Sequence, residues 1–133
     1  MDQKSVDRTR RIVAGLGYAG ACTFLLVTTY MQGARAAIIT ISLASFCNDL
    51  AMPPSWAATM DMGGRYAGTL SGAMNSWGNL GGAVAPAVIG YVLAWTHNDW
   101  NIAFYISAVL YAAAIPCWIF LDSVTPLEVI SPQ

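Results

Sequence analysis

The feature that most constrains the fold is a run of 23 residues without a charge, Gly68 to Gly90. It is rich in Gly, Ser and Asn and contains a Pro, a composition that disfavours a helix in water. On a helical wheel its small and polar residues share one arc of roughly 120°, and the large apolar residues take the other side. The small and polar face comprises Gly68, Ser71, Gly72, Asn75, Gly78, Asn79, Gly82, Pro86 and Gly90. This pattern inverts that of a soluble amphipathic helix.

A membrane explains the inversion. Lipid tails are as apolar as leucine, so membrane helices associate through close backbone contact at small residues and through interhelical hydrogen bonds. We therefore predict a transmembrane helix whose bulky side faces lipid and whose small and polar side faces protein. Two G-x-x-x-G pairs, Gly68 with Gly72 and Gly78 with Gly82, are expected to let neighbouring helices pack closely.

Composition agrees with a membrane protein. The 133 residues are 56% hydrophobic and 10% charged, whereas soluble domains carry about 25% charged residues. A net charge of −1, without basic clusters interleaved with aromatic residues, argues against a nucleic-acid partner. We expect the lipid bilayer to be the main surroundings of the chain.

No chemistry-bearing motif is present. The three cysteines stand singly in apolar runs, which argues against a metal site and a disulfide. His97 has no partner at metal-ligand spacing, and the sequence has no nucleophile triad, phosphate-binding glycine loop or zinc signature. The sequence therefore predicts no enzyme, no cofactor and no metal.

The apolar runs predict an all-α integral membrane fold with four crossings in a single domain, 1–133. The expected helices are 12–30, 36–60, 67–95 and 102–121, with a basic segment 1–11 before them and a tail 122–133 after them. The N-terminus and the loop 61–65 then share one side and hold five of the six basic residues. By the positive-inside rule both termini are cytoplasmic in a multi-pass protein of the cell (inner or plasma) membrane.

The second predicted helix is interrupted. Asn48, Asp49, Pro53 and Pro54 fall within it, so the helix is expected to kink or unwind with Asp49 near the bilayer midplane. A carboxylate there costs about 2.5 to 3.5 kcal/mol on insertion scales, so it needs a partner. The partner is either a bound proton, a bound cation or a basic group from outside this chain. Alternatively, Asp49 caps the unwound segment and is satisfied by backbone amides.

Polar side chains on the third helix suit a solute. Asn75 and Asn79 are four residues apart on the side that carries Ser71, and amides both donate and accept hydrogen bonds. They fit the hydroxyl and carboxylate groups of a solute such as a sugar acid, or they join helices by interhelical hydrogen bonds. Trp56 follows the two prolines and is either the wall of a cavity or an anchor at the membrane interface.

The stretch WAATMDMGGRYAGTLSGAMNSWGNLGGAVAPAVIGY, residues 56–91, resembles the region of the tenth and eleventh helices of the major facilitator superfamily. It is most similar to the anion:cation symporter branch. The segment DRTRR, residues 7–11, resembles the end of the cytoplasmic loop between helices eight and nine. By this resemblance the four predicted helices correspond to the last four of twelve.

The resemblance implies secondary active symport of a small organic anion, such as a sugar acid, with a proton or sodium ion. The site would lie near the midplane, with Asn75 and Asn79 at the central cavity and Trp56 and Asp49 on the neighbouring helix. The family keeps its main coupling carboxylates and its anion-binding arginine in the first half, so we expect this chain to be a fragment completed by the missing helices. The alternative is a small four-helix membrane subunit or assembly scaffold without transport activity, which forms oligomers through its glycine-rich face.

Overall fold

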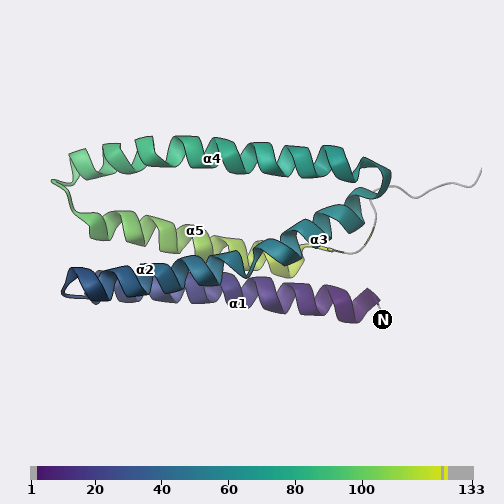
Figure 1. Cartoon of the computed structure of the whole chain (residues 1–133), viewed down its shortest axis with the longest axis horizontal. Coiled ribbons are helices and arrows are strands. Elements are labelled where there is room, and N and C mark those ends of the chain that lie inside the picture. Colours follow the sequence, from purple (N-terminus) through teal and green to yellow (C-terminus); the bar gives the residue numbers. More distant parts are fainter. Residues whose placement is uncertain (1–2, 124, 126–133) are drawn as a thin grey trace, which may run out of the picture.

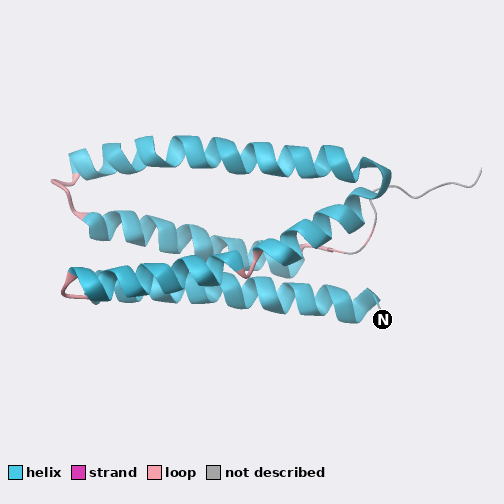
Figure 2. Ribbon diagram, viewed as in Figure 1, coloured by secondary structure: helices cyan, strands magenta, loops and turns pink. Residues whose placement is uncertain are grey.

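The computed structural model describes residues 3–123 and 125, and this part of the chain is helical without a strand (Figure 2). The elements are α1 (Gln3–Tyr30), α2 (Ala34–Asp49), α3 (Met52–Gly63), a short 3-10 helix η1 (Gly64–Tyr66), α4 (Ala67–Trp95) and α5 (Trp100–Phe120). The predicted all-α class is confirmed. Most of the expected tail 122–133 lies outside the described residues.

The helices run back and forth along one axis (Figure 1). α1 packs against α2 and α5, and α3 leads across to α4 on the far side of the molecule. The N-terminus and the turn at η1 lie at one end, which we call the basic end because it holds Lys4, Arg8, Arg10, Arg11 and Arg65. Arg35, in the first turn of α2, lies at the opposite end.

Three helical runs are long and apolar enough to cross a membrane: Lys4–Tyr30, Ala34–Trp95 and Trp100–Phe120. The second run has 62 residues, far more than the roughly 20 that span the hydrocarbon core. It reverses direction at η1, where Gly64 has a φ of +47°, a conformation that favours glycine. The chain therefore makes four passes.

The second pass is broken at Leu50 and Ala51, between α2 and α3. The expected interruption of this helix between Asn48 and Pro54 is confirmed. Pro53 and Pro54 themselves lie in the first turn of α3. The first turn of a helix tolerates proline because its N–H groups have no partner inside the helix.

Small residues bring α1 and α2 together at this break. A β-carbon on Gly20 would lie 2.8 Å from the Cys47 sulfur, and one on Gly17 would clash with the backbone of Cys47. The nearby buried cluster is dominated by alanine: it comprises Ala14, Ala51, Ala58 and Trp118. This close packing fixes where the break lies relative to α1.

α4 meets the rest of the chain through part of its bulky side. The Thr59 hydroxyl of α3 donates to the Met74 sulfur at 3.2 Å. Val84 and Val88 line a groove of about 260 Å³ between α4 and α5 and remain about half exposed. The prediction that the bulky side faces lipid is therefore wrong at Met74 and stays a prediction at the two valines. A helical wheel shows which residues share a face, but it does not show where the neighbouring helices lie.

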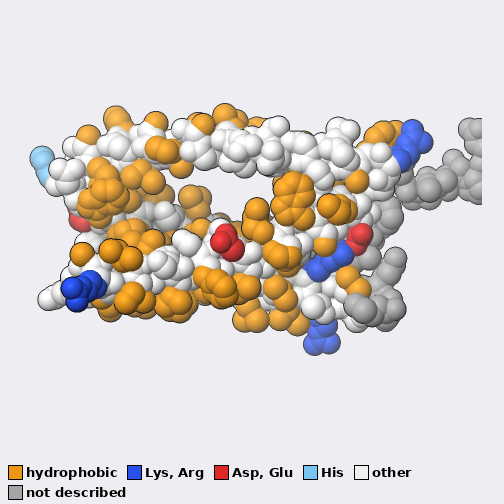
Figure 3. Space-filling model, in the orientation of Figure 1, with side chains coloured by type: hydrophobic (Ala, Val, Ile, Leu, Met, Phe, Trp, Pro, Cys, Tyr) orange, Lys and Arg blue, Asp and Glu red, His pale blue; other side chains and the backbone are white. Residues whose placement is uncertain are grey.

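The glycines of α4 have no close neighbour in the described part of the chain. A β-carbon on Gly68, Gly72, Gly78 or Gly82 would meet nothing within 4 Å. Their role in helix packing stays a prediction, and any partner helix must come from outside the described residues. The space-filling view shows hydrophobic side chains along the length of the molecule and basic groups toward its ends (Figure 3).

Candidate functional site

The contact between Thr59 and Met74 sets the register of the antiparallel helices α3 and α4. Trp56 lies three residues from Thr59 toward the middle of the molecule. Trp77 lies three residues from Met74 in the same direction. Trp56 of α3 and Asn75 and Asn79 of α4 therefore all lie on the mid-molecule side of the Thr59–Met74 contact.

The two amides are available for a ligand. Asn75 and Asn79 are exposed, and Ser71, one turn before Asn75, is half-buried. In residues 3–123 neither amide makes a hydrogen bond, so the described chain contains no partner for an interhelical bond at either position. Trp56 is half-buried on α3, the helix that contacts α4 from the Met74 side.

Asp49 lies farther from the basic end. It is the last residue of α2 and is exposed. Ten residues, including the α2–α3 break, separate it from Thr59. Figure 1 shows the α2–α3 break near mid-length, and Figure 3 shows an acidic group there.

The Asp49 carboxylate has no ion-pair partner in the described part of the chain. The two ion pairs found there, Arg10 with Asp61 and Arg11 with Asp7, are both at the basic end. Nor does a backbone amide of the described residues donate to it, as the capping interpretation required. An exposed carboxylate in the middle of a membrane pass is left for a ligand or for another protein segment.

A cavity next to the break was not foreseen from the sequence. It has a volume of about 300 Å³ and is lined by Tyr18 of α1 and by Ser107, Leu110, Tyr111 and Ala114 of α5. The two tyrosine rings are 6.0 Å apart between centroids. Tyr111 is also within electrostatic reach of Asp49. The sequence signal that could have pointed to this cavity is the presence of two tyrosines inside apolar runs, because a buried phenol hydroxyl usually has a polar partner.

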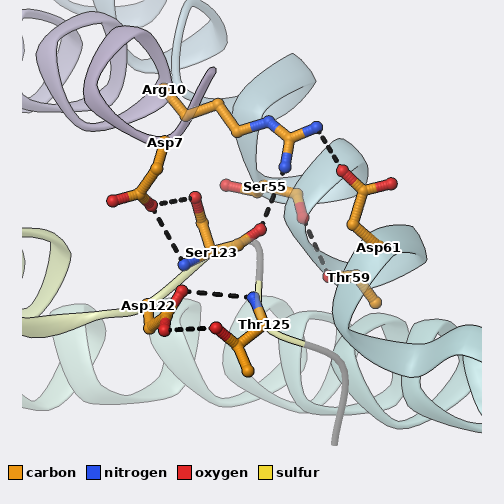
Figure 4. Close-up of polar contacts among 8 residues, drawn as sticks. All are labelled: Asp7, Arg10, Ser55, Thr59, Asp61, Asp122, Ser123 and Thr125. Atoms are coloured by element: carbon orange, nitrogen blue, oxygen red, sulfur yellow. Dashed lines mark hydrogen bonds and ion pairs between the residues drawn. The ribbon is translucent and has the colours of Figure 1, made fainter. Parts of the chain in front are cut away.

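A polar cluster ties the chain together at the basic end (Figure 4). Arg10 donates to the Asp61 carboxylate at 2.6 Å and to the Ser123 carbonyl at 2.9 Å. The Ser123 backbone amide and hydroxyl both donate to the Asp7 carboxylate. One cluster thus joins the start of α1, the end of α3 and the segment after α5.

The same contacts act on the Asp7 carboxyl. Desolvation by burial would raise its pKa, but the hydrogen bonds from Ser123 and the Arg11 guanidinium 2.7 Å away outweigh this effect. The pKa of Asp7 is therefore held below its ordinary value of 3.8. The cluster favours the ionised carboxylate and holds the segment after α5 against α1.

Comparison with known proteins decides the family. The model of the Major Facilitator Superfamily matches residues 6–133. The chain belongs to this superfamily. The resemblance found in the sequence is thereby confirmed, and so is the expectation of a membrane-spanning fold. No solved structure is significantly similar to the chain.

The related superfamily members include proteins named for anion transport. The chain is 32% identical over 119 residues, 90% of its length, to a probable sulfoacetate transporter of Cupriavidus necator. It is 29% identical to probable anion transporter 1, chloroplastic, of Oryza sativa subsp. japonica and 26% identical to sodium-dependent phosphate transport protein 1, chloroplastic, of Arabidopsis thaliana, each over 86% of this chain. The chain spans 27%, 21% and 22% of the lengths of these relatives.

Within the superfamily, helices pack into two halves around a midplane site. In this chain Trp56, Asn75 and Asn79 lie on the mid-molecule side of the Thr59–Met74 contact, and Asp49 lies at the α2–α3 break. Sequence reasoning missed Tyr18 and Tyr111, and it also missed Ser123, because contacts between residues 113 or more apart in the chain leave no local pattern.

Proposed function

We propose that this chain supplies four transmembrane helices of a secondary transporter that carries a small organic anion with a cation. The observation that carries the proposal is the superfamily match over residues 6–133, together with relatives named as anion transporters. The chain covers about a quarter of the first of these relatives. The rest of the solute pathway must therefore come from further helices.

The solute-binding surface is the polar face of α4. The amide N–H groups of Asn75 and Asn79 donate to carboxylate or sulfonate oxygens, and the Ser71 hydroxyl adds a donor one turn away. Trp56 lies on α3, which contacts α4 from the Met74 side, and provides an apolar surface next to this region. Neutral donors bind an anion without trapping it as strongly as a full positive charge would, which suits a carrier that must also release its solute.

Asp49 couples cation movement to solute movement. Its carboxylate is alone in mid-span, so it binds a proton or a sodium ion more readily than it stays charged and unpaired. Cation binding neutralises the negative charge of the Asp49 carboxylate. The anionic solute then enters against less repulsion, which links the binding of the two ligands. The basic end faces the cytoplasm in this account.

A chimera tests the transport proposal. This chain would replace the aligned segment of the Cupriavidus necator relative, and uptake of labelled sulfoacetate would be measured in cells that lack their own carrier. We expect uptake above the vector background. The double variant Asn75→Ala/Asn79→Ala should reduce uptake about tenfold or more, since each lost hydrogen bond to a charged group costs about 1.5 to 3 kcal/mol.

The matched control is Asn101→Ala, an exposed amide at the start of α5 near the opposite end of the molecule. It should leave uptake unchanged. A chimera that inserts normally but shows no uptake would contradict the proposal. If the chain alone then forms a defined oligomer in detergent, the interpretation as a small membrane subunit is favoured instead.

A further inference from the structure

We propose that the break between α2 and α3 is a sodium site in which the Asp49 carboxylate and the Leu50 carbonyl oxygen bind the ion. The role of the ion in coupling rests on the proposed transport function. The binding itself rests only on the atoms at the break. No basic residue of the described chain approaches them to form an ion pair.

The Leu50 carbonyl is the decisive group. In a helix a carbonyl oxygen accepts from the N–H three or four residues later. For Leu50 these positions are Pro53 and Pro54, and proline has no N–H. Ala51 differs, because its carbonyl accepts from the Ser55 amide at 3.2 Å. Leu50 therefore presents a carbonyl oxygen that no helical hydrogen bond can satisfy.

The neighbouring residues add oxygen atoms of the same kind. Asp49 supplies its carboxylate, and its carbonyl also loses a donor because the fourth residue after it is Pro53. Asn48 is half-buried, and its side-chain amide makes no hydrogen bond in residues 3–123. Three consecutive residues at the break thus carry amide, carboxylate and carbonyl oxygens, which are the ligands that hard cations prefer.

The charge of the site selects a monovalent ion. A single carboxylate balances one positive charge, and Asp49 is the acidic residue at the break. The described residues contain no group of three or more His, Cys, Asp or Glu that could hold a metal ion. A divalent or transition metal would lack both the compensating charge and the side-chain ligands.

A proton satisfies the site less well than sodium. Protonation neutralises the Asp49 carboxylate but leaves the Leu50 oxygen unpaired in the middle of a membrane pass, where an unsatisfied backbone group is costly. A sodium ion contacts both groups at once. Broken membrane helices elsewhere use unwound carbonyls in this way to coordinate sodium. Binding of the ion at the break would thereby affect the angle between α2 and α3.

The test uses the whole chain, purified and placed in nanodiscs of zwitterionic lipid, with binding of labelled sodium measured in choline buffer. We expect saturable binding of one ion per chain. Asp49→Asn should abolish it. Pro54→Ala, which returns an N–H donor to the Leu50 carbonyl, should weaken it about tenfold. The matched control, Pro116→Ala, changes a proline inside α5 and should leave binding unchanged.

Unchanged sodium binding in Asp49→Asn would overturn the site, as would the absence of saturable binding to a wild-type chain whose circular dichroism is helical. Asp49→Asn preserves side-chain size and gives an independent result if Pro54→Ala does not insert. The chimera separates this proposal from the transport proposal. Proton-driven uptake without sodium binding removes only the sodium site, whereas sodium binding without uptake removes only the transport function.

Discussion

Gly17 of α1 touches the backbone of Cys47 on α2: a β-carbon on Gly17 would lie 2.7 Å from the Cys47 carbonyl oxygen. The same β-carbon would lie 3.3 Å from the Ala51 amide nitrogen, which is within the α2–α3 break. Gly17 is close to the midpoint of α1. The contact therefore holds the break, and with it Asp49, at the middle of the bundle.

Gly17→Ala should destabilise the chain by about 1 to 3 kcal/mol, because an overpacked contact forces the backbones of α1 and α2 apart. The measurement is the unfolding free energy in mixed detergent micelles. Gly15→Ala is the control, since a β-carbon there meets nothing within 4 Å. Alanine is also the better helix former, so this variant should be neutral or slightly stabilising. Equal losses in the two variants would contradict backbone contact at Gly17.

The cluster at the basic end makes a second prediction. Arg10→Ala should cost about 1 to 3 kcal/mol, because the variant loses the bond to Asp61 and leaves the Ser123 carbonyl without its donor. The Arg10 side chain is only 14% exposed, which limits screening by water. Arg8→Ala, an exposed arginine two residues before it, should change the unfolding free energy little. A similar loss in both variants would show that the cluster does not stabilise the fold.

Asp7 predicts a pH dependence. Its pKa is lowered in the folded chain, so its contribution to stability is fully present above the ordinary value of 3.8. That contribution is lost as the pH falls through the lower, folded pKa. Unfolding free energies measured from about pH 6 to about pH 3 should therefore fall more steeply for the wild type than for Asp7→Asn. Parallel curves for the two proteins would refute the shift.

Ser123→Ala separates the causes of that shift. The variant loses the hydroxyl bond to Asp7 and keeps the bond from the backbone amide. In this variant the pKa of Asp7 should move back toward 3.8. The loss of stability in acid should then lie between that of the wild type and that of Asp7→Asn. An Asp7 titration that does not respond to this variant would assign the shift to Arg11 and the Ser123 backbone amide, without the hydroxyl.

The sequence was sufficient for the fold class because the relevant signal is local. An apolar run long enough to cross a bilayer, such as the one that forms α5, needs no tertiary contact to be recognised. The polar face of α4 could also be read in one dimension, because helical periodicity decides which residues share a face. The sequence did not show which neighbours this face meets, because that depends on where α3 and α5 lie.

Long-range contacts set the limit. The bond between Arg10 and Ser123 joins residues 113 apart in the chain, and nothing near either residue marks the other. The break was expected between Asn48 and Pro54 and lies there, but its place at Leu50 and Ala51 was not predicted; it arises because prolines begin a helix more easily than they interrupt one. Gly17 was missed because an isolated glycine in a helix carries no sign of what will pack against it.

The most direct test of the account compares two transport modes in the chimera, wild type and Asp49→Asn. Accumulation driven by a cation gradient requires a bound cation at Asp49, whereas exchange of labelled for unlabelled solute requires only solute binding. We predict that Asp49→Asn abolishes accumulation, keeps exchange and inserts normally into the membrane. Accumulation by Asp49→Asn that remains dependent on the sodium or proton gradient would contradict the account.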